Sequence, residues 1–225
     1  MQPTRLRRYR EFTGRLDGLL SASPIITYGL ALPFAVMGTV DTRSALGLSL
    51  AMFCINAVAV LLAYFLKKAG LGREVYMLIT ALVSTLTLVG ISGFIGGIHN
   101  RVFSLMGIYF PLLSVNTLTF FLVTRCDPKK SLLNNLLRSV RTSLSFLIVV
   151  MPIAAFRELF GKGSLYGVQL FSGFQIPSVL LPFFGFILVG MVCALTRFVS
   201  RNIKYELLLR DRRDREAARE EGEKI

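Results

Sequence analysis

Six long apolar segments occupy most of this chain, and they constrain its fold more than any other feature. A helix needs about 20 apolar residues to cross the hydrocarbon core of a bilayer. The chain has 225 residues, of which 53% are hydrophobic, and its apolar segments of about this length lie at residues 23–42, 45–66, 75–96, 102–124, 142–160 and 178–199. They predict an all-α, polytopic membrane protein with six transmembrane helices, whose membrane domain spans residues 23–200.

The basic residues predict how these helices are oriented. Of the 26 Lys and Arg residues, 22 lie in the N-terminal segment, the second and fourth connections and the C-terminal segment, which share one side of the membrane. The other side keeps four: Arg43, Arg101, Arg157 and Lys162. Because positively charged loops stay in the cytoplasm, both termini are expected to be cytoplasmic.

The net charge of +13 is typical of nucleic-acid binding in a soluble domain, but here it is explained by topology and by an anionic inner leaflet. We therefore expect membrane lipid as a partner and no nucleic acid. Cys54, Cys126 and Cys193 lie too far apart for a metal-ligand pattern or a disulfide framework. The chain also lacks a nucleotide-binding glycine loop and the common catalytic motifs, so it is not expected to be a catalyst on its own.

Three segments near the apolar spans are amphipathic or strongly charged. Residues 1–22 combine apolar positions at helical spacing with arginines, which predicts a short amphipathic helix on the cytoplasmic surface. Residues 128–142 have the same design, and either lie on the surface or extend the fifth span. Residues 201–225 are predicted to form a charged cytoplasmic tail, as a frayed helix or a disordered segment.

The first and fourth spans share a local pattern that predicts broken helices. Pro33 is followed six residues later by Thr39, and Pro111 is followed six residues later by Thr117. Proline interrupts the hydrogen bonds of a helix, and the two spans run in opposite directions. The pattern therefore indicates a 3+3 inverted repeat with breaks near Gly29–Pro33 and Gly107–Pro111. The alternative is two ordinary proline kinks.

A few polar residues within or beside the spans are candidates for an ion or electron path. They are Asn116 and Thr117 beside the second break, Thr39 beside the first, and the adjacent charges Arg157 and Glu158 at the end of the fifth span, together with Pro33 and Pro111. A charged residue in a membrane is a functional candidate by default. Arg157 and Glu158 point about 100° apart on a helix, so they need not pair with each other. The alternative is that both charged side chains simply extend to the membrane–water interface.

Several segments together resemble a known family. GREVYMLITALVSTLTLV, SLMGIYFPLLSVNTLTFF and FRELFGKGSL have the order and spacing found in the six-span subunits shared by the Rnf electron-transport complex and the Na+-translocating NADH:quinone reductase. The charge distribution matches the E-type member in Rnf and the D-type member in the reductase. The resemblance implies two oppositely inserted paralogous subunits that share an iron–sulfur centre, held by one cysteine from each broken helix.

This chain departs from that family at both cysteine positions. Residues 31–33 read Ala-Leu-Pro where the first cysteine is expected, and Thr117 occupies the second position. Thiolates are the usual ligands of iron–sulfur clusters, so the cofactor does not carry over to this chain. We expect no cofactor or metal held by this chain.

The resemblance implies a membrane subunit of an ion-translocating Rnf/Nqr-type electron-transport complex, which contributes to the electron or ion path or to its scaffold. The expected partners are an oppositely inserted paralogous six-span subunit and the flavin- and iron–sulfur-carrying subunits. The alternative is a stand-alone small transporter or channel on the same inverted-repeat scaffold, without a redox role, in which Thr39, Asn116 and Thr117 would bind an ion or a small solute.

Overall fold

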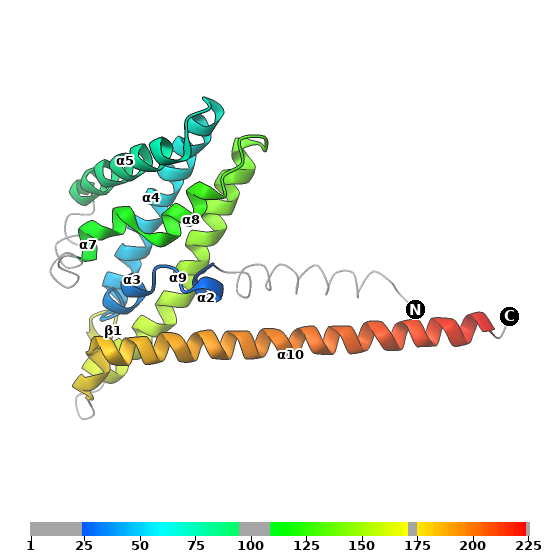
Figure 1. Ribbon diagram of the computed structural model, residues 1–225. Coiled ribbons are helices and arrows are strands. Elements are labelled where there is room, and N and C mark those ends of the chain that lie inside the picture. Colours follow the sequence, from blue (N-terminus) through cyan, green and yellow to red (C-terminus); the bar gives the residue numbers. More distant parts are fainter. Residues whose placement is uncertain (1–23, 95–108, 171–174, 224–225) are drawn as a thin grey trace.

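The computed structural model describes residues 24–94, 109–170 and 175–223, which are mainly helical (Figure 1). The predicted amphipathic segment at residues 1–22 lies outside these ranges. In chain order the elements are α2 (Pro24–Tyr28), α3 (Leu32–Met37), α4 (Thr42–Lys68), α5 (Arg73–Phe94), α7 (Tyr109–Leu112), the 3₁₀ helix η1 (Leu113–Val115), α8 (Thr117–Thr124), α9 (Leu132–Lys162), the hairpin strands β1 (Ser164–Leu165) and β2 (Val168–Gln169), the 3₁₀ helix η2 (Pro177–Leu180) and α10 (Pro182–Glu223).

Within the described ranges, four helices are long and apolar enough to cross a membrane: α4, α5, α9 and the first part of α10. About half of the apolar stretch is buried in α4 (56%) and α9 (50%), against 22% in α5 and 17% in α10. Helices α4 and α9 therefore form the centre of the bundle. Their fully buried side chains, such as Leu48 and Met52 of α4 and Phe146 of α9, make up much of its core.

The two halves of the chain repeat one order of elements: a broken helix followed by two long helices. Helices α2 and α3 precede α4 and α5, whereas α7, η1 and α8 precede α9 and α10. Helices α4 and α9 run antiparallel, because Thr42 at the start of α4 bonds to Glu158 near the end of α9, and Asn56 bonds to Ser143 midway. Corresponding helices therefore run in opposite directions, as the predicted inverted repeat requires.

The first break lies where the sequence predicts it. Residues 29–31 separate α2 from α3, and both Gly29 (φ 66°) and Ala31 (φ 59°) adopt the left-handed conformation. Glycine adopts this conformation freely, whereas a residue with a Cβ rarely does. Pro33 lies in the first turn of α3, where a helix loses no hydrogen bond to proline.

In the described residues, the break of the fourth span lies at residues 113–116, just after the expected position near Gly107–Pro111. Gly107 is outside the described residues, and Pro111 lies inside α7. The chain leaves helical geometry through η1 and becomes extended at Asn116 (φ −99°, ψ 154°). Pro33 thus follows its break and Pro111 precedes its own, so the shared Pro-to-Thr spacing does not mark equivalent positions. Asn116, rather than proline, makes the second break.

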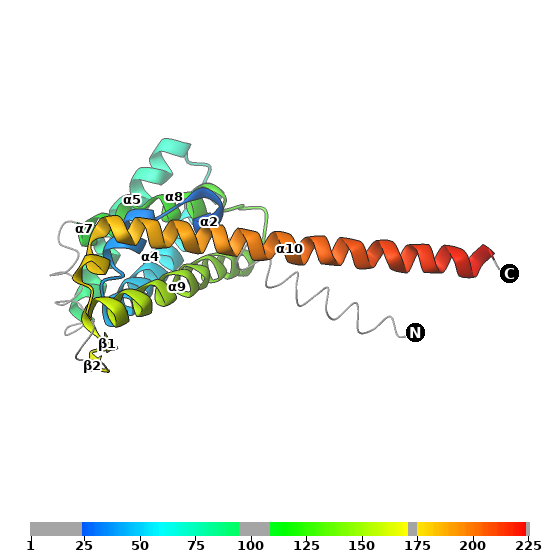
Figure 2. The same cartoon turned by 90° about the horizontal axis from the view of Figure 1, so that it is seen from below.

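The remaining segments settle two alternatives left by the sequence. Helix α9 begins at Leu132, so most of residues 128–142 extend the fifth span. Helix α10 continues without interruption to Glu223. Figures 1 and 2 show that its last part extends well beyond the bundle.

Candidate functional site

The two helix breaks contact each other in the fold. The backbone N–H of Ala31, at the N-terminal end of α3, donates a hydrogen bond to Thr117 Oγ1 at the start of α8, over 3.1 Å. Half-helices α3 and α8 therefore begin at the same place. We call this the junction, defined by residues 29–31 and 113–117. It brings Thr117 next to Ala31, one of residues 31–33 at which the resemblance led us to expect the first cysteine.

Asn116 closes the α8 side of the junction by replacing hydrogen bonds that the helix lacks. Its Oδ1 accepts a hydrogen bond from the Thr119 N–H over 2.8 Å, which is an N-cap of α8. Its Nδ2 donates to the Leu113 carbonyl over 2.6 Å and lies 2.8 Å from Thr119 Oγ1. One side chain thus satisfies backbone groups on both sides of the break, as a non-aqueous surrounding requires.

A chain of buried hydrogen bonds leads from the junction to the centre of the bundle. Thr119 Oγ1 donates to Asn56 Oδ1 over 2.7 Å, and Asn56 Nδ2 donates to Ser143 Oγ over 3.0 Å. Asn116, Thr119, Asn56 and Ser143 are each at most 2% exposed. This series of hydrogen bonds joins α8, α4 and α9. These four side chains include no ionisable group, so the hydrogen bonds fix the geometry of the break rather than offering a titratable site.

The outer face of the junction is uncovered. Pro33, Pro111, Val115 and Thr117 are exposed, although Ala31 and Asn116 beside them are buried. Exposed side chains of α3, α7, η1 and α8 therefore lie beside the breaks at the surface of this chain, while the non-helical residues Ala31 and Asn116 are buried.

Arg157 organises a second polar group, at the end of the bundle where α9 finishes. Its guanidinium is fully buried and donates to the carbonyls of Val36 (2.5 Å), Val179 (3.0 Å) and Leu180 (2.6 Å). It also donates to Thr39 Oγ1 over 2.7 Å. These acceptors belong to the last turn of α3, the residues that follow it, and η2. The planar group with five donors suits such a set of acceptors.

Glu158 points to different partners, as the 100° separation predicts. Its Oε2 accepts hydrogen bonds from the N–H of Thr42 (2.7 Å) and from Thr42 Oγ1 (2.5 Å), at the start of α4. Its Oε1 accepts from the Gly167 N–H (2.8 Å), in the turn of the β1–β2 hairpin. A carboxylate at a helix N-terminus is favoured by the helix dipole. Glu158 thus joins α9 to α4 and to the hairpin.

The sequence candidates therefore separate into two groups. Asn116 and Thr117 belong to the junction, together with Ala31, while Thr39 joins Arg157 and Glu158 at the far end of the bundle. Pro33 and Pro111 flank the breaks. Sequence reasoning missed Asn56, Thr119 and Ser143, because isolated polar residues within apolar helices reveal their partners only in the fold.

The residues at the junction do not fit an iron–sulfur centre. Ala31 offers no side-chain ligand, and Thr117 offers a hydroxyl where a thiolate is needed. Cys126 packs with Ala59 and Val60 near the end of α4, and Cys193 lies on α10. No group of three or more His, Cys, Asp or Glu residues is arranged to hold a metal ion in the parts of the chain that the structure describes.

Comparisons with known proteins agree with this architecture. A family model described as "Rnf-Nqr subunit, membrane protein" matches residues 12–193. The E subunit of an ion-translocating oxidoreductase complex from Cellvibrio japonicus is 24% identical over 216 residues, which cover 87% of this chain and 88% of the relative. The protein of the same name from Pseudomonas paraeruginosa is 25% identical over 207 residues, with coverages of 83% and 84%. The E subunit of a proton-translocating ferredoxin:NAD(+) oxidoreductase complex from Clostridium ljungdahlii is 22% identical over 191 residues, with coverages of 83% and 88%.

Proposed function

Because this chain belongs to the Rnf-Nqr family of membrane subunits, we propose that it is a membrane subunit of an Rnf-type, ion-translocating electron-transport complex. The observation that carries this proposal is the family match over residues 12–193, together with relatives named as the E subunits of such complexes, which align along most of their length. The chain acts as part of the complex, in the inner membrane of a prokaryotic cell and with both termini in the cytoplasm.

The junction is the part of this subunit that contributes to the transmembrane path or to its scaffold. Its two half-helices meet through the hydrogen bond from Ala31 to Thr117, so the family's arrangement of breaks persists without thiols. This chain therefore holds no iron–sulfur cluster on its own residues. Electrons that cross the membrane pass through other subunits, while this chain supports the ion path or the structure around it.

An oppositely inserted six-span paralogous subunit covers the junction. Lipid offers no hydrogen bonds, so non-helical backbone at membrane depth must be buried by protein or line a cavity. The exposed positions Pro33, Pro111, Val115 and Thr117 support such a contact. Flavin- and iron–sulfur-carrying subunits complete the proposed complex.

The test is purification of the tagged chain from its native membranes in mild detergent, followed by identification of the co-purifying subunits and analysis of iron. We expect a second six-span subunit and larger redox subunits. Photo-cross-linking from Val115 should capture the six-span partner, whereas cross-linking from Leu78 of α5, which is also apolar and exposed, serves as the matched control. A stable monomer, active as a transporter, would replace this proposal with the stand-alone transporter.

A further inference from the structure

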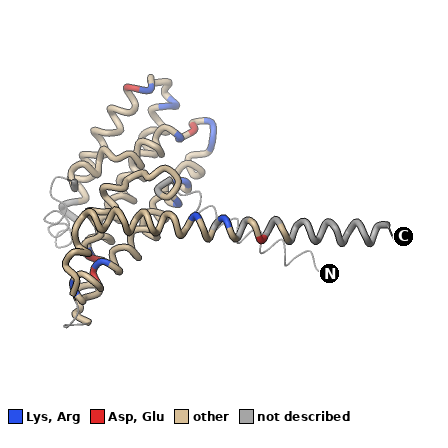
Figure 3. The backbone as a smooth tube through the Cα atoms, turned by 60° about the horizontal axis from the view of Figure 1, so that its bottom comes forward, with Lys and Arg blue, Asp and Glu red and all other residues tan. Residues whose placement is uncertain are grey.

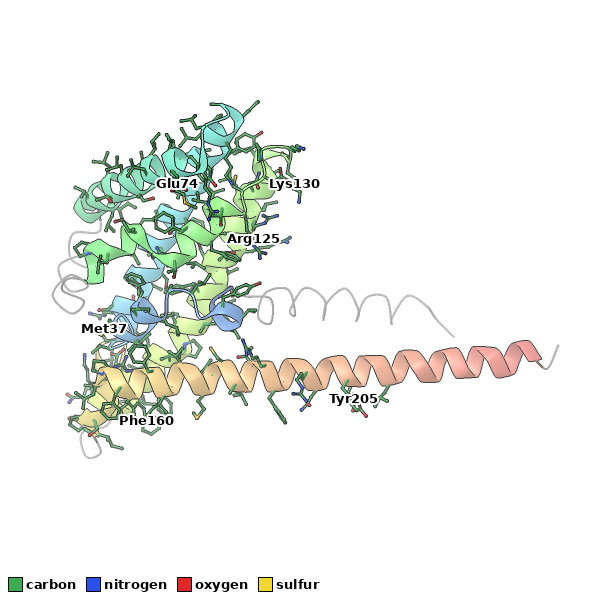
Figure 4. All side chains as sticks on the ribbon, viewed as in Figure 1. Met37, Glu74, Arg125, Lys130, Phe160 and Tyr205 are labelled. Carbon is green, nitrogen blue, oxygen red and sulfur yellow. The ribbon has the colours of Figure 1, made fainter. Side chains whose placement is uncertain are left out.

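One end of the bundle carries a concentration of positive charge. Among the described residues, the adjoining ends of α4, α5, α8 and α9 bring together eight basic residues: Lys67, Lys68, Arg73, Arg125, Lys129, Lys130, Arg138 and Arg141. In the same described segments, the acidic residues at this end are Glu74 and Asp127. Figure 3 shows basic residues gathered at one end of the bundle, and Figure 4 labels Glu74, Arg125 and Lys130 toward that end. Arg157 and Glu158 lie near the opposite end of α9.

The eight cations divide into two kinds. Lys67 Nζ donates to the carbonyls of Thr124 (2.9 Å) and Cys126 (2.8 Å), and Arg138 Nη1 donates to the Arg125 carbonyl (2.7 Å). These two side chains cap the C-terminal end of α8 and are structural. The side chains of Lys68, Arg73, Arg125, Lys129, Lys130 and Arg141 are exposed, so they are available to a ligand.

An apolar stripe on α9 reaches this basic end. Leu133, Leu137, Val140 and Leu144 recur at helical spacing and are 63%, 45%, 37% and 43% exposed. Helix α9 has 31 residues and is about 46 Å long, against a hydrocarbon core of about 30 Å. Its first turns therefore leave the hydrocarbon core, and the stripe continues into the headgroup layer.

The cations and the stripe form one amphiphilic surface. Arg141 lies one helical turn from both Leu137 and Leu144, so it borders the stripe. Arg138 holds the Arg125 backbone beside α9, and the exposed Arg125 guanidinium lies over the Phe121 ring of α8, 4.6 Å from its centroid. This arrangement combines cations that can bind an anion with an apolar stripe that runs toward the bilayer centre. A free phosphate would contact only the cations.

We propose that this surface binds an anionic phospholipid, with its phosphate between Arg125 and Arg141 and one acyl chain along Leu133, Leu137 and Leu144. Charge complementarity favours an anionic lipid, because the phosphate of a zwitterionic lipid is balanced by its own amine. Each basic residue near a membrane surface contributes about 1 kcal/mol to the attraction, or about fivefold in affinity.

The test compares binding of phosphatidylglycerol and phosphatidylcholine to the full chain, purified with its native partners, by native mass spectrometry. We expect a preference for phosphatidylglycerol that falls roughly 30-fold in R125Q/R141Q. The matched control, K68Q/R73Q, removes two exposed cations from the α4–α5 connection at the same end and should lower the preference much less, because these two residues lie outside the proposed phosphate site. Leu133→Ser/Leu137→Ser should also weaken binding, and inorganic phosphate at the same concentration should not compete.

Four results would overturn the proposal. An equal loss of lipid binding in R125Q/R141Q and in K68Q/R73Q would indicate diffuse electrostatic attraction and not a defined site. Equal binding of the two lipids would remove the role of charge. Full competition by inorganic phosphate, with normal binding in the leucine variant, would identify a simple anion site. Loss of a co-purifying protein in R125Q/R141Q, with lipid binding unchanged, would show that the surface contacts a protein. Size-exclusion profiles that match the unmodified protein confirm that each variant is folded.

Discussion

At the residue scale, the fully buried Arg157 donates hydrogen bonds to the carbonyls of Val36, Val179 and Leu180 and to Thr39 Oγ1. It reaches carbonyls at the end of α3 and in η2, two segments more than 130 residues apart in sequence. A single guanidinium therefore fixes the broken first helix to the entry of α10. Gly185 allows this approach, because a Cβ built there would lie 3.1 Å from Arg157 Nη1.

We predict that Arg157→Ala destabilises the protein by about 3 kcal/mol or more, at about 1–3 kcal/mol for each buried group left unsatisfied. Arg157→Lys should recover only part of this loss, because one ammonium cannot match the planar set of donors. Thermal unfolding in detergent, followed by size-exclusion fluorescence, measures both effects. The exposed Arg73→Gln is the control and should unfold normally. Unchanged stability in Arg157→Ala would show that this group does not hold the helices together.

The thiol of Cys126, in the connection between α8 and α9, gives a second prediction at this scale. Burial raises its pKa, against the opposite influence of Lys67 and Arg138. Since the thiolate is the reactive form, a raised pKa means less thiolate at neutral pH and slower alkylation. In a C54S/C193S background, labelling by a soluble maleimide should be slower in the folded than in the unfolded protein, and should still be accelerating above about pH 8.5, the usual pKa of a free thiol. A rate that is already constant below that pH would contradict the raised pKa.

At the element scale, the meeting of α3 and α8 is the feature that most directly constrains function. After Cys54, Cys126 and Cys193 are changed to Ser, we predict that Ala31→Cys/Thr117→Cys forms a disulfide under mild oxidation, because the Ala31 N–H and Thr117 Oγ1 are 3.1 Å apart. Counting free thiols with a maleimide-linked polymer on a gel measures this. The pair Ala31→Cys/Leu133→Cys, with Leu133 near the basic end, should stay reduced. Two free thiols in the first pair would mean that the breaks do not meet.

Disulfide formation between positions 31 and 117 should depend on the buried hydrogen bonds that support the second break. Asn56→Leu removes both the acceptor for Thr119 and the donor to Ser143. We predict slower disulfide formation between the cysteines at positions 31 and 117 in this background, because the second break loses its support from α4 and α9. Asn134→Leu, at an exposed asparagine on α9, is the matched control. Equal rates in both backgrounds would limit the chain of hydrogen bonds to general packing.

The sequence predicted the elements better than their connections. Long apolar segments and clustered glycine and proline are local signals, and they located the spans and the first break. The described second break lies after the expected Gly107–Pro111, at Asn116, because the side chain of Asn116 replaces the hydrogen bonds that the helix loses there. Arg157 and Glu158 were recognised as candidates, but their partners Val36, Thr39 and Thr42 lie more than 110 residues away. Only packing of α3 and α4 against α9 reveals that these charges fasten the bundle.

At the scale of the whole molecule, the two ends of the bundle have different chemistry. The end with the α4–α5 and α8–α9 connections carries exposed cations, whereas Arg157 and Glu158 at the other end are buried and hydrogen-bonded within the protein. Helices α5 and α10 bury little of their apolar surface against the rest of this chain. The subunit thus has a basic end that suits the cytoplasmic leaflet, an opposite end fastened by buried charges, and broad apolar flanks for lipid or for neighbouring subunits.

This asymmetry predicts the orientation of the chain in the membrane. Lys130 and Gln169 are both exposed but lie at opposite ends of the bundle, so cysteines at these positions report the two sides. In intact cells, with the native cysteines changed to Ser, a membrane-impermeant maleimide should label Gln169→Cys, and should label Lys130→Cys only after permeabilisation. The expected pattern follows from retention of basic loops in the cytoplasm. Labelling of Lys130→Cys in intact cells would show that the subunit has the opposite orientation in the membrane. The proposed anionic lipid would then face the outer leaflet, and the partner at the junction would need the orientation proposed here for this chain.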